Sequence, residues 1–448
     1  MFSYRTALTV LAAAGATTVF ANPVLVDEGP SPITGGQTEG LVQNAVAGAV
    51  NAIAAHPVDA NILYAGGTNG GIWKTTDALA VDPTWVNQTD ALPAQSIGDL
   101  VFDPVDATHQ TLVAGIGLFS SYGRIGGARE GLLRTTDGGN TWTVIAPDLR
   151  TRNVSKLAVA GDRIVAAINF AEDFSCGNVG VYRSTDGGAT FEQLTLEANG
   201  IPAGVSTVVT AQPGAPDVLY ASVIFADVCE GSDNGIFRSD DGGASWTRLS
   251  DPALDATVTN DTGLTEIEIA PDGTVYVAST LNGRLAGVFQ STDNGTTWTA
   301  MDIPGTEEPG FVGVHPGGQG SIHFSLAIDP TDSNIVYVGG DRQPLTDEGG
   351  FPNAIGARDF SGRLFRGDIS TPAGSQWAPL THSGTAAVSS PHADSRDMAF
   401  DASGRLIESD DGGVYVRTDP RSALGAFHAA LEQDGDNIAA IRGLARTA

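Results

Sequence analysis

A glycine followed six positions later by an aspartate recurs seven times along this chain, and this repeat constrains the fold more than any other feature. The copies are Gly71–Asp77, Gly131–Asp137, Gly180–Asp186, Gly235–Asp241, Gly287–Asp293, Gly362–Asp368 and Gly413–Asp419. Successive aspartates lie 49 to 75 residues apart, and an aromatic residue follows each of them, a tryptophan in five copies. Repeats of this length are structural units that bury their apolar faces against one another.

Each repeat contains four short runs typical of β-strands. In the second repeat, two runs that start at Ile97 and Leu112 precede the glycine, and a third run follows it up to Asp137. Alternation and β-branched residues favour strands, while Gly, Pro and Asp interrupt every run long enough to form a helix. Seven four-stranded units predict an all-β, seven-bladed β-propeller of antiparallel blades, forming one domain over residues 45–431.

The charge balance excludes several classes of function. The chain has 448 residues, with 23 Lys and Arg against 52 Asp and Glu, giving a formal net charge of −29. Such a chain repels phosphates, so we expect no nucleic-acid partner and no binding to anionic lipid through basic residues. Its 41% hydrophobic content is too high for a disordered acidic chain.

The two ends of the chain differ from the repeats. Arg5 precedes an apolar run from Thr6 to Phe20, which predicts a signal peptide over 1–21 and a secreted or periplasmic protein with no membrane span after cleavage. Residues 22–44 form an N-terminal segment in which the run from Val24 offers an outer strand to close the ring. The tail, 432–448, is expected to be irregular or a short helix. A truncated relative of a longer propeller is an open alternative.

Four repeats share a fuller pattern, Ser or Thr-x-Asp-x-Gly-x-x-Trp or Phe, between their last two strands. Its aspartates are Asp137, Asp186, Asp241 and Asp293. The carboxylate can accept main-chain N–H groups of the turn, the glycine allows positive φ, and the aromatic packs between blades. These motifs resemble the Asp-box (BNR-repeat) propellers, which include sialidases, xyloglucanases and sortilin-like proteins. The resemblance implies that these aspartates are structural, not catalytic.

The strand directions place the candidate binding residues on one face. With strands A to D in each blade, the B–C and D–A loops share a face, and the B–C loops are long at 118–130, 170–179, 226–234 and 342–361. We call this side the loop face. Cys176 and Cys229 lie in two of these loops and can form a disulfide in an oxidising compartment.

The seventh repeat holds the most suggestive residues. The segments Pro391–Arg396 and Ser409–Gly413 resemble the HxD…DGG pattern of sortilin-like and xyloglucanase-like bacterial propellers. Asp410 and Asp411 are the candidate catalytic residues. The candidate ligand-binding residues are His392, Asp394, Arg396, Asp341, Arg342, Asn69 and Arg124.

The first repeat argues against catalysis. In xyloglucanases a blade-1 turn of the form Thr-Asp-x-Gly-Gly carries a catalytic Asp, whereas this chain has Thr68-Asn69-Gly70-Gly71. An asparagine cannot act as a general base. We therefore expect a non-catalytic propeller that binds a glycan or an extracellular protein. The alternatives are a xyloglucanase-like glycoside hydrolase that uses Asp410 or Asp411, and a sortilin-like sorting or assembly factor.

Metal and sialidase chemistry have weak support. The seven histidines form no metal-binding motif, so we expect no transition-metal site and no cofactor. Calcium is the open alternative, because acidic turns such as Asp410–Asp411 and Asp240–Asp241 offer oxygen ligands. Sialidases have an Arg-Ile-Pro motif, and the nearest string here, Arg124-Ile125-Gly126, lacks the proline.

Overall fold

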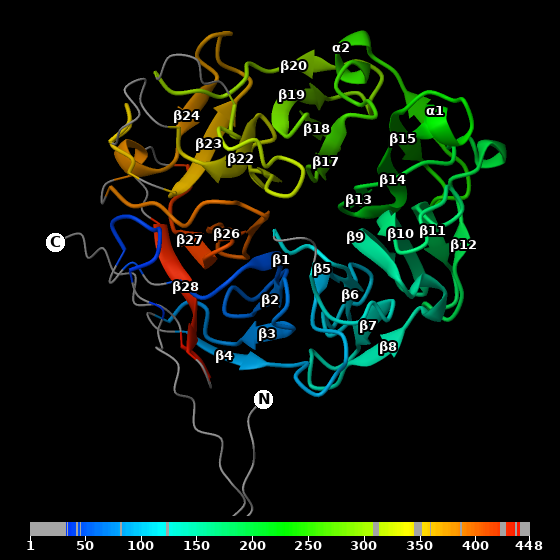
Figure 1. Cartoon of the computed structure of the whole chain (residues 1–448), viewed down its shortest axis with the longest axis horizontal. Coiled ribbons are helices and arrows are strands. Elements are labelled where there is room, and N and C mark those ends of the chain that lie inside the picture. The colour runs from blue at the N-terminus through cyan, green and yellow to red at the C-terminus, as the bar shows by residue number, and fades with distance from the viewer. Residues whose placement is uncertain are drawn as a thin grey trace, which may run out of the picture.

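The computed structural model describes residues 33, 35–41, 44, 46–80, 83–121, 125–307, 313–344, 352–358, 360–385 and 388–421, and the main chain of 427–434 and 437–439. These residues form a ring of radial antiparallel sheets around a central axis (Figure 1). Five sheets have four strands, and a sixth has nine because it joins the first and last blades. The predicted seven-bladed, all-β propeller is confirmed.

The strands of each blade are numbered from the axis outwards. Blades 1 to 3 contain β1 (Val50–Ala55), β2 (Leu63–Gly67), β3 (Ile72–Thr75) and β4 (Thr84–Asn87); β5 (Ile97–Phe102), β6 (Leu112–Ile116), β7 (Leu132–Thr135) and β8 (Thr143–Ile145); and β9 (Arg152–Ala160), β10 (Arg163–Ala171), β11 (Gly180–Ser184) and β12 (Glu192–Gln193). Blades 4 and 5 contain β13 (Val209–Gln212), β14 (Ala215–Val223), β15 (Gly235–Ser239) and β16 (Thr247–Leu249); and β17 (Thr262–Ile269), β18 (Val275–Leu281), β19 (Arg284–Ser291) and β20 (Thr299–Ala300). Blades 6 and 7 contain β21 (Ser325–Ile328), β22 (Ile335–Arg342), β23 (Gly362–Asp368) and β24 (Trp377–Pro379); and β25 (Asp397–Phe400), β26 (Leu406–Asp410), β27 (Gly413–Arg417) and β28 (Phe427–Asp434), followed by β29 (Asn437–Ala439). The short helices are η2 (Pro147–Leu149), η3 (Glu197–Asn199), η4 (His382–Gly384), α1 (Ala226–Cys229) and α2 (Pro252–Asp255).

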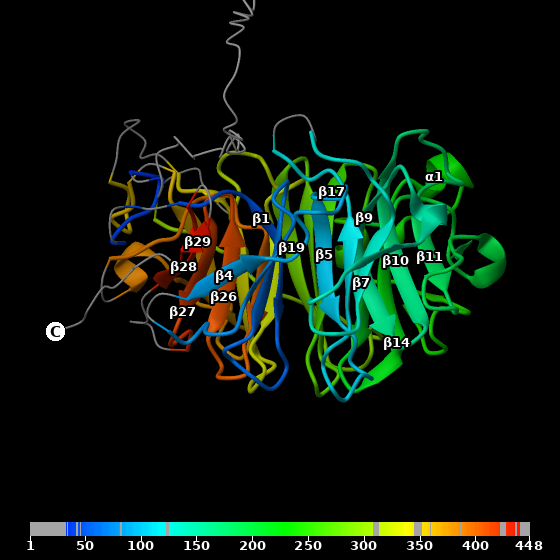
Figure 2. The same cartoon turned by 90° about the horizontal axis from the view of Figure 1, so that it is seen from below.

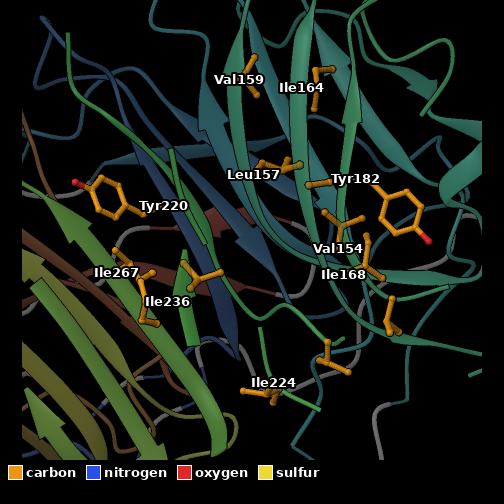
Figure 3. Close-up of a cluster of buried hydrophobic side chains, with 14 of the residues drawn as sticks. Val154, Leu157, Val159, Ile164, Ile168, Tyr182, Tyr220, Ile224, Ile236 and Ile267 are labelled. Carbon is orange, nitrogen blue, oxygen red and sulfur yellow. The ribbon is translucent and has the colours of Figure 1, made fainter. Parts of the chain in front are cut away.

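The core lies between neighbouring blades. Every residue of β6 is buried, because the sheet of blade 2 is covered on both faces by blades 1 and 3. Figure 3 shows one such layer, in which Leu157 and Ile164 of blade 3 belong to the same apolar cluster as Ile236 of blade 4 and Ile267 of blade 5. Burial of these faces is the main driving force that holds the blades side by side.

The turns between strands C and D have the same hydrogen bonds in four blades. In blade 2, Asp137 Oδ1 accepts the main-chain N–H of Thr141 at 2.9 Å and the hydroxyl of Thr135 at 2.8 Å. The Thr135 hydroxyl in turn accepts the N–H of Gly139, whose φ is 87°. Hydrogen bonds from Thr141 and Thr135 hold the pKa of Asp137 below its ordinary value. Each such turn precedes an aromatic such as Trp142, which is buried against blade 1.

The end of the chain closes the ring. Strand β29 pairs with β28 of blade 7 and with β4 of blade 1, through Ile438 opposite Trp85. Residues 432–434 and 437–439 are thus strands, where an irregular or short helical tail was expected. The outer edge of β4 presents unpaired main-chain groups, which a hairpin satisfies better than a helix does. The signal peptide and the run from Val24 lie outside the described residues.

The N-terminal segment that precedes blade 1 lies over blades 6 and 7. Glu39 pairs with Ser390, the N–H of Ala47 donates to the carbonyl of Gly412 at 2.6 Å, and Leu41 is buried in the core between blades 6 and 7. This path brings the segment onto the face that carries the B–C loops.

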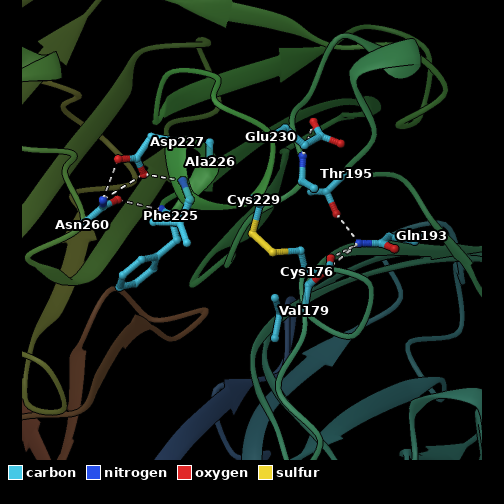
Figure 4. Close-up of a disulfide and its surroundings, with 12 residues drawn as sticks. Cys176, Val179, Gln193, Thr195, Phe225, Ala226, Asp227, Cys229, Glu230 and Asn260 are labelled. Atoms are coloured by element: carbon cyan, nitrogen blue, oxygen red, sulfur yellow. Dashed lines mark hydrogen bonds between the residues drawn. A yellow bond between two sulfur atoms is a disulfide. The ribbon is translucent and has the colours of Figure 1, made fainter.

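The B–C and D–A loops emerge together on one side of the disc. Helix α1, in the B–C loop of blade 4, lies on that side in Figure 2. A disulfide joins Cys176 of blade 3 to Cys229 at the end of α1, with 5.7 Å between the Cα atoms (Figure 4). It links two neighbouring loops of the loop face.

We predict that replacing both cysteines, Cys176→Ser with Cys229→Ser, lowers the free energy of unfolding by about 4 kcal/mol, because the bond closes a loop with a sequence separation of 53. Chemical denaturation under oxidising conditions measures the change. The reduced wild-type chain is the control and should match the double variant. Equal stability of oxidised wild type and double variant would contradict the prediction.

Candidate functional site

Arg396 is the centre of a polar network at the mouth of the axial channel on the loop face. It directly precedes β25, and its side chain is only 1% exposed. The Nε atom donates to Asp411 Oδ1 at 2.5 Å, and Nη1 donates to Asn51 Oδ1 and to the carbonyl of Phe119, each at 3.0 Å. The Nη2 atom donates to Ser121 Oγ at 2.7 Å. One guanidinium therefore joins blade 7 to blades 1 and 2.

His323 extends this network to blade 6. This residue precedes β21, and its ring is buried. The Nε2 atom lies 3.1 Å from Ser121 Oγ, and Nδ1 lies 3.1 Å from Asp394 Oδ1. The Ser121 hydroxyl also donates to Asp411 Oδ2 at 2.9 Å. Burial opposes ionisation of Asp411, but Arg396 and His323 outweigh it and lower the pKa of this carboxyl. Asp411 is thus a fixed anion at neutral pH.

The same residues raise the question of a metal. His323, Asp394 and Asp411 each offer one ligand atom, and these atoms lie within 4.8 Å of one another. However, the Arg396 guanidinium already occupies Asp411 Oδ1, and its Nη2 lies 3.3 Å from His323 Nε2. A metal ion would face this positive charge, so the arrangement fits an ion-pair network better than a metal centre.

The two candidate catalytic residues have different environments. Asp410 is fully buried, and its Oδ1 accepts the N–H groups of Gly412 at 2.7 Å and Gly413 at 2.9 Å. Burial and the neighbouring Glu408 raise the pKa of Asp410 well above its ordinary value. Asp411 keeps 20% of its side chain exposed. Asp410 therefore holds the turn, and Asp411 is the carboxylate that solvent reaches.

Three further predicted ligand-binding residues line the neighbouring loops. Asp341 is buried and accepts the N–H groups of Gly317 and Gln319, and burial raises its pKa. The Arg342 guanidinium lies over the ring of Phe360, 5.5 Å from its centre. His392 is half-buried against the Gly412 turn. Asp341 thus organises a loop, whereas Arg342 lies closer to the surface.

Asn69 contacts blade 2. It is exposed, its Oδ1 accepts the Ser96 hydroxyl at 2.8 Å, and its Nδ2 donates to the carbonyl of Ile125 at 3.3 Å. Arg124 lies outside the described residues. Of the predicted set, the structure therefore brings Asp394, Arg396 and Asp411 into one network.

Sequence reasoning missed Ser121 and His323. Ser121 lies in the long B–C loop of blade 2, within a region already expected to carry recognition residues, but no motif singles it out. His323 stands at the loop-face end of an inner strand, the same place that Arg396 takes in blade 7. A search for polar residues just before each inner strand would therefore have identified His323 from the sequence.

Below this network the axis is hollow. A cavity of about 60 Å³ is lined by residues that include Asn51, Asn153, Lys156, Glu266 and Arg396. Lys156 and Glu266 also line a second cavity of about 170 Å³, which lies deeper between the inner strands. The two cavities therefore meet at this lysine and glutamate.

The deeper cavity is rich in carboxyl groups. Lys156 Nζ lies 3.7 Å from Glu266 Oε2 and 3.8 Å from Asp397 Oδ1. Burial raises the pKa of Asp99 to about 6, of Glu266 to about 7 and of Glu268 to about 8, although Lys156 partly offsets the effect. One lysine thus faces more acids than it can neutralise, and these acids retain protons towards neutral pH.

These shifts predict that the folded chain loses stability as the pH rises. An unfolded glutamate releases its proton near pH 4.5, whereas folded Glu268 keeps it until about pH 8. Between these values only the folded state holds the proton, so the free energy of unfolding falls with increasing pH. We compare the free energy of unfolding of Glu268→Gln with that of wild type at each pH. We expect this difference to shift in favour of the variant by at least ~1 kcal/mol between pH 5.0 and pH 8.5.

Urea denaturation at the two pH values measures this difference. The matched control is Glu307→Gln, at an exposed loop position, which should follow the wild type. If Glu268→Gln and wild type change in parallel between pH 5.0 and 8.5, the proposed proton retention at Glu268 is wrong.

Comparisons with known proteins found relatives by sequence and by fold. No family model matches the chain. A xyloglucanase of a Paenibacillus species is 29% identical over 290 residues, which are 56% of this chain and 26% of that protein. A xyloglucanase of Hypocrea jecorina is 26% identical over 302 residues, which are 65% of this chain and 30% of that protein. The matches thus cover less than a third of the length of these curated relatives.

Solved structures show the same fold. A GH74 enzyme of Niastella koreensis matches 88% of this chain and 59% of its own, with a TM-score of 0.56 and 18% identity. The GH74 xyloglucanase of Xanthomonas campestris matches equal shares, with a TM-score of 0.55 and 17% identity. The chain is therefore a seven-bladed β-propeller whose structural neighbours include GH74 xyloglucanases.

These relatives correct the leading expectation from the sequence. We expected a non-catalytic binder because Asn69 replaces the aspartate of the blade-1 turn. The curated relatives are xyloglucanases, which contradicts that expectation and favours the glycoside hydrolase alternative. The sortilin-like resemblance stays a sequence-based hypothesis. Among the residues that the structure describes, no helix has the length and apolar character needed to cross a bilayer.

Proposed function

We propose that this protein is a secreted glycoside hydrolase that cleaves a β-glucan of the xyloglucan type at the loop-face mouth of its channel. One observation carries the proposal. Asp411 and Asp394 are both partly exposed and lie on either side of the His323 ring. A carboxylate oxygen of Asp411 lies within 4.8 Å of a carboxylate oxygen of Asp394. Hydrolysis of a glycosidic bond requires two carboxyl groups that act on one linkage.

The environments of the two carboxyls suggest their roles. Asp411 stays ionised because Arg396 pairs with it. Since carboxylate oxygens within 4.8 Å leave no room for a water between the two groups, we assign Asp411 the part of nucleophile. Asp394 lacks an arginine among its contacts in the described residues and faces His323, so we assign it the part of proton donor. The φ of Asp394 is 75°, an unusual value for a residue other than glycine, which often marks a functional position.

The xyloglucan substrate is supported by the names of the relatives and by exposed aromatic residues in the long loops of the loop face. Phe174 and Phe360 are 55% and 44% exposed on long loops of the same face. Exposed aromatic rings offer flat apolar surfaces to the faces of sugar rings. In the Ser409–Gly413 turn, Asp410 takes the position of the aspartate in the motif Thr-Asp-x-Gly-Gly, but it is buried and holds the turn. The carboxylate that Asn69 does not supply would therefore come from the next residue, Asp411.

The test measures release of reducing ends from xyloglucan by the purified chain. We expect Asp411→Asn to lower the turnover rate at least ~100-fold, because the nucleophilic carboxylate is removed. Asp162→Asn is the matched control, since Asp162 is exposed in a turn on the opposite face. Thermal denaturation of both variants separates loss of chemistry from loss of folding.

Two results would contradict the proposal. One is a wild-type chain that releases no reducing ends from xyloglucan or from other β-glucans. The other is a folded Asp411→Asn chain that keeps the wild-type rate, because hydrolysis would then take place at another site.

A further inference from the structure

Two fully buried acids lie behind the Asp411 turn. Glu408 and Asp410 are two residues apart on β26, so their side chains lie on the same face of the strand. Tyr415 of β27 pairs with Glu408 across the sheet and is also fully buried. The neighbours of this face, such as Met398 and Tyr337, belong to the core between blades 6 and 7.

Several oxygen atoms in this cluster lack hydrogen bonds. In the described part of the chain, no hydrogen bond of ordinary geometry reaches the carboxylate oxygens of Glu408, Oδ2 of Asp410 or the hydroxyl of Tyr415. Only weaker contacts face them, from Ser395 and Asp410 to Glu408 and from the main chain of His392 to Tyr415. Burial, and then the charges of Asp410 and Glu408, raise the pKa of the Tyr415 hydroxyl. Leaving buried polar atoms unpaired is costly, so such a group of atoms calls for a missing partner.

The charges around the pair do not supply that partner. The charged groups that act on Glu408 and Asp410 are each other and two further carboxyls, Asp397 and Asp411, and the contacts that offset them are the Ser395 hydroxyl at Glu408 and the N–H groups of Gly412 and Gly413 at Asp410. The nearby side chains add oxygen donors, not nitrogen. The Ser395 hydroxyl faces Glu408 and lies 2.7 Å from the Ser325 hydroxyl of blade 6.

A glycine borders these hydroxyls. At Gly339 a Cβ atom would lie 2.4 Å from Ser395 Oγ and 2.6 Å from Ser325 Oγ. The absence of a side chain on this strand therefore lets the hydroxyls of two blades come together beside the acids. The resulting donor set contains carboxylate and hydroxyl oxygens only.

We propose that Glu408 and Asp410 bind a calcium ion between blades 6 and 7, with the Tyr415 hydroxyl as a further ligand and the Ser395 hydroxyl beside it. Calcium accepts an irregular set of hard oxygen ligands, whereas zinc and copper favour nitrogen or sulfur. The ion would neutralise the two buried acids. Because the other oxygen of Asp410 accepts the N–H groups of Gly412 and Gly413, it would also fix the turn that carries Asp411.

The other acidic turn named from the sequence lacks these features. Asp240 pairs with Arg238 on the exposed surface, and Asp241 accepts the bonds of its own turn. Calcium binding at Glu408 and Asp410 does not depend on hydrolysis, so the two proposals can fail separately.

The test uses the full chain after dialysis against a chelator. Isothermal titration with calcium chloride should show one site, and calcium should raise the midpoint of thermal unfolding by a few degrees. We expect Glu408→Gln to abolish both effects, whereas Glu307→Gln, the matched control, should keep them. Terbium luminescence adds a direct readout, because Tyr415→Phe should reduce the sensitised emission.

Three results would overturn the proposal. The first is a chelated wild-type chain that takes up no calcium and shows no shift, which would mean that protons neutralise the pair. The second is a Glu408→Gln chain that binds calcium as the wild type does, which places the ion elsewhere. If Glu408→Gln does not fold, Glu408→Asp replaces it, and we expect this variant to lose at least ~10-fold in calcium affinity. The third overturning result is a Glu408→Asp chain whose calcium affinity stays within 2-fold of wild type.

Discussion

The buried guanidinium of Arg396 is the interaction on which the loop face depends. A charged group that is almost fully buried is stable only if its N–H groups and its charge are satisfied together. Asp411 balances the charge, while Asn51, Phe119 and Ser121 accept the remaining hydrogen bonds. These partners come from blades 7, 1 and 2, so they meet only when the ring is closed. The candidate site therefore forms only when the ring is closed, and β29 is the strand that closes it.

Electrostatic balance along the axis follows the same logic. The chain carries a formal net charge of −29 and has only two lysines, yet one of them, Lys156, lies in the channel beside Glu266 and Asp397. Arg396 at the mouth and Lys156 below it are the positive charges of the two cavities. The acids that face them outnumber them, so protons supply part of the balance in the channel. Behind Asp411, where the nearest strong charges are carboxyls, we assign that part to calcium.

The sequence was sufficient to predict the fold because the determinants of a blade are local. The turn around Asp137 is built from residues within one short segment, and the same segment recurs, so a pattern search finds it. The closing strand β29 was not predictable in this way. It is only three residues long, and its pairing with Trp85 of β4 depends on the last blade reaching the first.

The candidate site was predictable only in part, for a related reason. Asp394, Arg396 and Asp411 lie within one blade and share a motif, so they were identified together. Ser121 and His323 come from loops 202 residues apart, and their contact exists only in the closed ring. Asn69 misled the functional interpretation, because the loss of one carboxylate in blade 1 says nothing about the carboxylates that blade 7 supplies.

The most direct test of this account is a crystal structure of the Asp411→Asn chain with a xyloglucan oligosaccharide. The account predicts that the sugar lies on the loop face, with a glycosidic oxygen within hydrogen-bond distance of residues 394 and 411. A sugar bound on the opposite face, among the turns that contain Asp137 and Asp241, would contradict it. So would crystals that bind no oligosaccharide at all.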